Sequence, residues 1–257
     1  MTFRYKQAKV HYTFSGEGEP IILLHGFLEN SLMWETLQKE LSKTYNVYVL
    51  DLPGHGKTEA IGYIHTMEDY AALVLAFAEH QKLKNFSLLG HSMGGYVALA
   101  LAELKSEKIK KLILLNSSSL ADSEVKQKER NRAITMIQKY PDAFIRMAVK
   151  HLFLPKDQKR LSAEINTAIL EANKCSQQGI INTLKGMRDR KDRTEVLKNF
   201  SDRSLMILGD QDKVINFEKT KIIAQEAGIE LEILPGGHMS YIEHPELLFK
   251  TVQEFLS

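Results

Sequence analysis

The segment GHSMGG, residues 90–95, contains the pattern G-x-S-x-G. It follows an apolar run at residues 86–89 and precedes an alanine- and leucine-rich stretch with helical spacing. A turn this tight between a strand and a helix strains the backbone of its central serine, and it needs glycine on both sides. We therefore interpret Ser92 as a nucleophile whose hydroxyl stands clear of the sheet. The alternative is a glycine-rich turn in which Ser92 only caps the helix.

A serine hydroxyl is a weak nucleophile, so it needs a base and a group that orients the base. His238 follows two glycines in the loop after the apolar run 231–234. Two acids, Asp210 and Asp212, follow the apolar run 205–208, and their spacing alone leaves both open. Of the other histidines, His91 is expected to shape the site, and His244 is expected to be structural.

The elements that must hold these residues alternate between short apolar runs and helical patterns. This order predicts an α/β fold with a mostly parallel central sheet flanked by helices. Near-continuous apolar runs are typical of strands that are buried on both faces. The expected strands are 21–24, 47–50, 86–89, 112–115, 205–208 and 231–234, preceded by a hairpin at 3–5 and 10–14; the expected helices are 31–42, 67–80, 93–104, 217–227 and 241–256.

Residues 120–200 differ from the rest of the chain. They contain no clear strand, and their apolar residues have helical spacing among many charged side chains. Both ends of this segment adjoin expected sheet strands. We therefore predict a core formed by residues 1–119 and 201–257, with a helical cap inserted at 120–200.

Together these motifs resemble the α/β-hydrolase superfamily, in its cap-bearing branch of esterases, lactonases and carbon–carbon bond hydrolases. The resemblance implies an α/β-hydrolase fold and the chain order serine, acid, histidine. The family pattern of a glycine, two variable residues and the acid leads to Asp212, which leaves Asp210 for a local turn. The family's oxyanion hole, carried over to the HGF segment at 25–27 and to the serine turn, uses the backbone N–H groups of Phe27 and Met93.

The activity implied is that of a serine hydrolase cleaving a carboxylic ester, thioester or lactone through an acyl-enzyme. The alternative is a lyase or carbon–carbon bond hydrolase with the same triad, similar to the menaquinone-pathway lyase or to meta-cleavage-product hydrolases. That lyase carries an arginine where this chain has Tyr96, which counts against it. A relative that binds ligand without turnover is disfavoured by the intact triad. Arginines of the segment 120–200 are candidates for an anionic substrate: Arg132, Arg146, Arg188, Arg190 and Arg193.

The composition of the chain limits the classes of ligand and partner to be expected. The net charge is +2, from 34 basic and 32 acidic residues, which gives no reason to expect nucleic acid. No metal-ligand spacing occurs, so neither a metal nor another cofactor is expected. Cys175 is the only cysteine, the start lacks a secretory pattern, and the apolar runs are too short to cross a membrane. We expect a cytoplasmic enzyme with a small ester-like substrate; the oligomeric state has no signature in the sequence.

Overall fold

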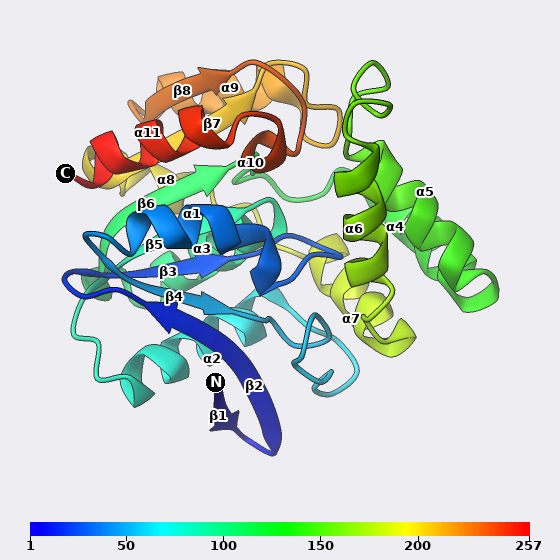
Figure 1. The fold of residues 1–257 in the computed structure, drawn as a ribbon, viewed down its shortest axis with the longest axis horizontal. Helices are drawn as coiled ribbons and strands as arrows, with labels where there is room; N and C mark the ends of the chain where they lie inside the picture. Colours follow the sequence, from blue (N-terminus) through cyan, green and yellow to red (C-terminus); the bar gives the residue numbers. More distant parts are fainter.

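The computed structural model describes residues 1–257 as one central sheet with helices on both faces (Figure 1). The eight strands lie in the order β1-β2-β4-β3-β5-β6-β7-β8. The pairs β1–β2 and β2–β4 are antiparallel, and all other neighbours are parallel. The predicted α/β fold and the leading hairpin are therefore confirmed. The strands are β1 (Thr2–Tyr5), β2 (Ala8–Ser15), β3 (Pro20–Leu24), β4 (Asn46–Leu50), β5 (Phe86–His91), β6 (Ile109–Leu115), β7 (Ser204–Gly209) and β8 (Glu230–Leu234).

The central strands are apolar along most of their length because helices cover both faces of the sheet. Every residue of β5 and β7 is buried. The edge strand β8 leaves Glu230, Glu232 and Ile233 exposed. The parallel register aligns Gly90 of β5 with Leu24 of β3. The segments that follow the parallel strands therefore meet at one edge of the sheet, where sites form in such folds.

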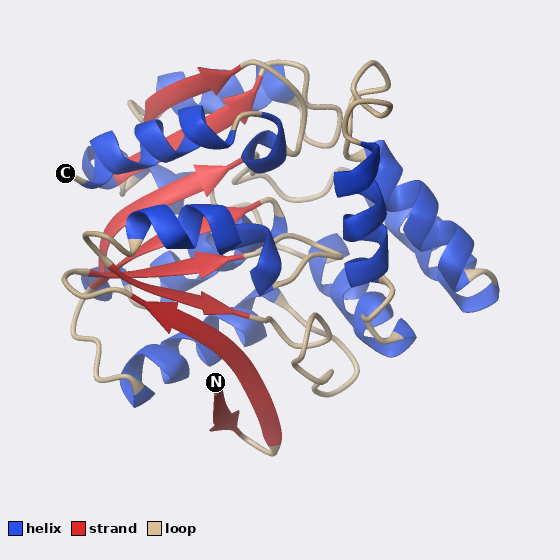
Figure 2. Ribbon diagram, in the orientation of Figure 1, coloured by secondary structure: helices blue, strands red, loops and turns tan.

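The flanking helices divide the core into two clusters of buried residues. One face packs against α1 (Glu35–Leu41) and α11 (Pro245–Leu256), in a cluster of 16 residues. The opposite face packs against α2 (Met67–His80) and α3 (Met93–Leu104), in a cluster of 51 residues that extends into the helices after β6. Figure 2 shows the two layers of helices on either side of the strands.

Two predicted helices are interrupted in the structure. The segment 241–256 forms α10 (Ser240–Glu243) and then α11, because Pro245 opens α11 and cannot continue the hydrogen bonding of a preceding helix. The segment 31–42 starts with a 3₁₀ turn (Ser31–Trp34) before α1. Residues 217–227 form α9 (Phe217–Glu226), close to the prediction.

The segment between β6 and β7 is helical and contains no strand, as predicted. Figure 1 shows most of it beyond the carboxyl ends of the parallel strands. There α4 packs against α5 and α7, and α5 packs against α6, whereas α8 packs against α3. The boundaries of a cap at 120 and 200 stay a prediction. The helices are α4 (Glu124–Lys139), α5 (Pro141–His151), α6 (Ser162–Ala172), α7 (Gln177–Arg188) and α8 (Thr194–Lys198), and further 3₁₀ turns span Ser106–Lys108 and Ser201–Arg203.

Helix α7 is held closely against the loop between β4 and α2. A Cβ atom added to Gly186 would lie 1.7 Å from the carbonyl oxygen of His65, so only glycine allows this approach. The Nε2 atom of the buried His65 accepts a hydrogen bond from Ile61 N–H at 3.1 Å. Its Nδ1 atom therefore carries the proton and faces the hydroxyls of Tyr70 (3.1 Å) and Thr183 (3.3 Å).

The burial of neutral His65 predicts that the protein loses stability in acid. Burial lowers the pKa of His65 to about 4, whereas the unfolded chain titrates it near 6.5. Between about pH 6.5 and 4 the unfolded chain binds a proton at His65 and the folded protein does not, which favours unfolding. The contribution of neutral His65 to stability is therefore full above about pH 6.5 and falls as the pH drops towards 4. Between pH 7.5 and 5 the loss should be about 2 kcal/mol. Urea unfolding of the wild type and of His65→Gln at both pH values measures it.

The exposed His151 provides the control, because His151→Gln should keep the wild-type pH dependence. The two variants are compared by the difference in unfolding free energy between the two pH values. Equal pH slopes for His65→Gln and the wild type would contradict the prediction.

Candidate active site

Ser92 lies in the tight turn between β5 and α3. Its backbone has φ 50° and ψ −113°, a strained conformation for a residue other than glycine, as expected from the sequence. A Cβ added to Gly90 would lie 2.3 Å from the carbonyl oxygen of Gly94, and one added to Gly94 would lie 2.2 Å from that of Leu24. The two glycines therefore let the turn close and let α3 begin directly against the end of β3.

The hydroxyl of Ser92 is free. Ser92 occupies the N-cap position of α3, but its side chain makes no capping hydrogen bond, so the simple capping interpretation is wrong. Its backbone carbonyl accepts a hydrogen bond from Ser117 Oγ at 2.7 Å. The residue lines a cavity of about 820 Å³ that His238 and Asp212 also line.

Asp212 and His238 form a direct pair at the sheet edge. Asp212 follows β7 and His238 follows β8, and the Nδ1 atom of His238 lies 2.7 Å from Asp212 Oδ2. The other carboxylate oxygen accepts the N–H groups of Val214 (2.7 Å) and Ile215 (3.2 Å). Because a carboxylate only accepts, His238 Nδ1 carries the proton, which leaves Nε2 with its lone pair. No hydrogen bond joins this Nε2 atom to Ser92 in the structure.

The charge of Asp212 is stabilised by its neighbours. Burial alone would raise its pKa, but attraction to His238 and hydrogen bonds from His238, Asn116 and Val214 outweigh burial and hold the pKa below its ordinary value. The carboxylate is therefore ionised at neutral pH. It can both fix the imidazole and stabilise a positive charge on it.

The carboxylate of Asp210 does not contact His238. It accepts the N–H of Gly236 at 2.8 Å, which ties the loop after β7 to the loop that carries His238. The local turn expected at Asp210 is formed instead by Asp212, with Val214. The sequence-based assignment of the turn to Asp210 is therefore wrong, because its carboxylate points across to the neighbouring loop.

Asn116, directly after β6, is a site residue that sequence analysis missed. Its side-chain amide donates to Asp212 Oδ2 (3.0 Å) and to the carbonyl of Gly237 (3.1 Å), and its oxygen accepts from Ser240 Oγ (2.7 Å). It thus holds both the acid and the loop of His238. The polar run that follows the apolar strand β6 at the carboxyl edge was the available signal.

The two expected oxyanion donors are the N–H of Phe27, which lines the same cavity as Ser92, and that of Met93, which follows Ser92 in the chain. Phe27 lines the cavity, and its N–H donates to no group of the protein. Met93 is the first residue of α3, whose N–H has no acceptor within the helix, and its side chain is fully buried. Helix α3 also directs the positive end of its dipole towards this point.

A buried ion pair joins three segments of the site. His91 Nδ1 lies 2.8 Å from Glu29 Oε2, and His91 Nε2 lies 3.0 Å from the carbonyl oxygen of His238. Both partners are acceptors, so the imidazole carries both protons and a positive charge. Glu29 Oε2 also accepts the N–H of Gly26 at 2.7 Å, and its Oε1 accepts from Tyr241 at 3.2 Å. His91 therefore shapes the site, as predicted.

The pKa values of the pair move apart. Burial alone would lower the pKa of His91, but the charge of Glu29 and the hydrogen bonds raise it above its ordinary value. Burial alone would raise the pKa of Glu29, but His91 outweighs burial and lowers it. Both shifts favour the charged forms, so the ion pair links the oxyanion loop, the serine turn and the His238 loop.

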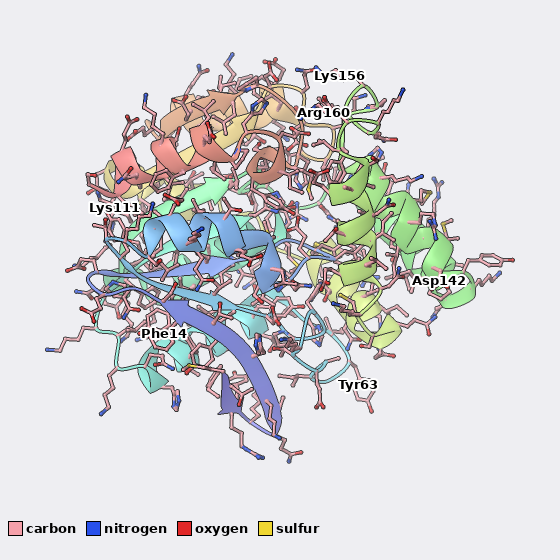
Figure 3. All side chains as sticks on the ribbon, in the orientation of Figure 1. Phe14, Tyr63, Lys111, Asp142, Lys156 and Arg160 are labelled. Carbon is pink, nitrogen blue, oxygen red and sulfur yellow. The ribbon has the colours of Figure 1, made fainter.

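Few large side chains of the segment 120–200 face the cavity. Leu152 lines it, whereas Phe144 and Phe153 belong to the buried core and Met147 is exposed. Arg190 is the one arginine of the five candidates that lines it. Figure 3 shows Lys156 in the loop after α5; its Nζ donates to Gln211 in the loop that carries Asp212.

No group of three or more His, Cys, Asp or Glu side chains is arranged to hold a metal ion. None of the helices is long and apolar enough to cross a membrane.

The sheet order, the strained serine turn and the acid–histidine pair define an α/β protein with a candidate active site at the carboxyl edge of the sheet. A family model described as alpha/beta hydrolase fold matches residues 19–245. The chain belongs to the α/β hydrolase fold family. The predicted family, fold and enzyme class are thereby confirmed.

The chain is also similar to individual proteins in sequence or in structure. A stretch of 81 residues is 33% identical to (E)-2-((N-methylformamido)methylene)succinate hydrolase of Acinetobacter baylyi, and it spans 32% of this chain and 31% of that protein. A thermophilic esterase from Thermogutta terrifontis has a similar structure, with a TM-score of 0.91 and 26% identity over 97% of this chain and 93% of that one. The enol-lactonase from Burkholderia xenovorans shares the fold, with a TM-score of 0.92 and 23% identity over 100% and 99% of the two chains.

Proposed function

We propose that this protein is a serine hydrolase that cleaves a carboxylic ester, thioester or lactone with the triad Ser92, His238 and Asp212. The observation that carries the proposal is the 2.7 Å contact between His238 Nδ1 and Asp212 Oδ2 in the cavity that Ser92 lines. Similar proteins named as an esterase, a lactonase and a hydrolase support an acyl-transfer activity.

The arrangement accounts for each step of hydrolysis. Neutral His238 takes the proton of Ser92 on Nε2 as Oγ attacks the carbonyl carbon, and Asp212 stabilises the imidazolium. The N–H groups of Phe27 and Met93 stabilise the oxyanion. His238 then gives its proton to the departing alcohol or thiol, and an acyl-enzyme remains on Ser92. His238 then takes a proton from water, whose oxygen attacks the acyl carbon; when the bond to Ser92 Oγ breaks, His238 returns this proton to Oγ, and the acid and free Ser92 are released.

The helices between residues 120 and 200 form a cap over this site in the proposed enzyme. Their location beyond the carboxyl ends of the strands supports that role. The cavity between them and the sheet is large enough for a small ester. The small-molecule substrate and the cytoplasmic location remain predictions from the sequence.

Covalent labelling and a substrate panel test the activity. Ser92 Oγ should attack the phosphorus of a fluorophosphonate, with its proton taken by His238 and fluoride released to solvent. The phosphonyl adduct is located by mass spectrometry of the peptide that holds both Ser87 and Ser92. The protein should also hydrolyse p-nitrophenyl esters, with a rate that varies with acyl length. Ser87, in the buried strand β5, is the internal control and should stay unlabelled. An adduct elsewhere, or no hydrolysis of any ester or lactone tested, would contradict the proposal.

A further inference from the structure

A cluster of one acid and two arginines lines the same cavity as Ser92. Arg130 Nε donates to Asp122 Oδ2 at 3.0 Å, and Arg190 Nη1 donates to Asp122 Oδ1. All three residues line the cavity, and their side chains are largely buried. One carboxylate faces two guanidinium groups, so the cluster keeps one unbalanced positive charge in the cavity that Ser92 also lines.

Arg190 is rigidly held. Its Nε donates to the carbonyl of Leu120 and its Nη1 to that of Met187, both at 3.0 Å. Its guanidinium lies over the ring of Tyr96, 4.0 Å from the centroid, and Tyr96 is one turn into α3 from the serine turn. The cluster is therefore fixed relative to the helix that presents the nucleophile.

Several N–H groups of the cluster have no partner. Arg130 Nη1, Arg130 Nη2 and Arg190 Nη2 donate to no group of the protein. None of these atoms is buried without a partner, so they are accessible to solvent, and both arginines line the cavity. A planar fork of this kind matches the two oxygens of a carboxylate.

The other basic residues considered for this role are engaged or lie elsewhere. Arg188 pairs with Asp189, and Arg193 pairs with Glu68 and Glu103. Arg132 and Arg146 are exposed and do not line the cavity. Of the five candidate arginines, Arg190 alone reaches the cavity, and it does so as part of the Asp122 cluster.

We propose that the substrate carries a free carboxylate, which Arg130 and Arg190 bind while the scissile carbonyl lies at Ser92. The substrate class is then a half-ester of a small dicarboxylic acid, or a lactone or thioester with a free carboxylate. The position of the bond to be cleaved rests on the proposed function, whereas binding of the carboxylate does not.

Binding is measured in the Ser92→Ala protein, which cannot turn the probes over by the proposed route. Calorimetric titration compares monomethyl glutarate with dimethyl glutarate, which differ by one charge and one methyl group. The monoester should bind about 10- to 100-fold more tightly, as expected for charge-assisted hydrogen bonds. Succinate and adipate monoesters test the distance between the arginine cluster and the serine.

Arg130→Gln in the same background should remove most of this preference. Asp122 keeps Arg190 as its partner in that variant, so no buried charge is left uncompensated. Arg130→Lys should retain part of the preference, and it decides the test if Arg130→Gln does not fold. Arg132→Gln, two residues further on α4, is the matched control and should keep the full preference.

Equal affinity for the monoester and the diester, or a preference that survives both Arg130 variants, would overturn the carboxylate site. Turnover of the same pair by the wild type separates the two proposals. Preferential binding together with no hydrolysis of any ester or lactone tested refutes the serine hydrolase and leaves the carboxylate site standing. Hydrolysis without preferential binding of the monoester refutes the carboxylate site and leaves the serine hydrolase standing.

Discussion

Ser92→Ala is expected to lower kcat for p-nitrophenyl butyrate by about six orders of magnitude, because members of a triad act as one unit. Without Oγ no acyl-enzyme can form, and only the oxyanion donors and substrate binding remain. Stability should change by less than about 0.5 kcal/mol, since the hydroxyl makes no hydrogen bond that the fold would lose. Steady-state kinetics on the purified variant, with thermal unfolding alongside, measures both effects.

Ser118→Ala is the matched control, because Ser118 lines the same cavity and also carries a hydroxyl. Its kcat should stay within a few-fold of the wild type. If Ser92→Ala retained turnover while Ser118→Ala lost it, the nucleophile would be assigned to the wrong serine. Retained turnover in both variants would exclude a serine nucleophile at either position.

Asp212→Asn should lower kcat by about three to four orders of magnitude, because it changes the tautomer of the base. The Oδ1 atom of Asp212 accepts the N–H groups of Val214 and Ile215, so an asparagine would keep its oxygen there. Its NH₂ group would then face His238 Nδ1 and donate to it. The imidazole would carry its proton on Nε2, where it can no longer accept the proton of Ser92.

Asp210→Asn is the matched control for this change, since it removes the same charge two residues earlier. Its oxygen can still accept the N–H of Gly236, so the cost should be at most about 1 kcal/mol of stability, with kcat nearly unchanged. Stopped-flow or steady-state kinetics of both variants on one ester gives the comparison. An inactive Asp210→Asn beside an active Asp212→Asn would reverse the assignment of the acid.

The sequence predicted the fold well because a strand that is buried on both faces of the sheet is a continuous apolar run, which can be recognised locally. A strand such as β5 is apolar throughout, and the serine turn follows it directly. The choice of Asp212 as the acid followed from the family pattern of a glycine, two variable residues and the acid, since spacing alone did not distinguish Asp212 from Asp210. The structure separates the two acids by the direction of their carboxylates, which depends on the neighbouring loop.

Contacts between residues far apart in the sequence could not be predicted in this way. Asn116 meets Asp212 across 96 residues, and Arg190 meets Asp122 across 68. The residues next to them in the sequence do not indicate either contact, because an asparagine after a strand or an arginine after a helix is compatible with many environments. The carboxyl edge of the sheet was predictable as the place of the site, whereas the partners that orient its side chains were not.

The buried pair of Glu29 and His91 also constrains how this sequence can change over generations. Replacing either residue alone leaves the other charge buried without compensation, which typically costs about 3–5 kcal/mol and takes a large share of the stability of an ordinary domain. Replacing both with apolar residues of similar volume can be close to neutral. Lineages descended from this protein should therefore keep both residues or lose both, and the single replacements that connect these states should be rare.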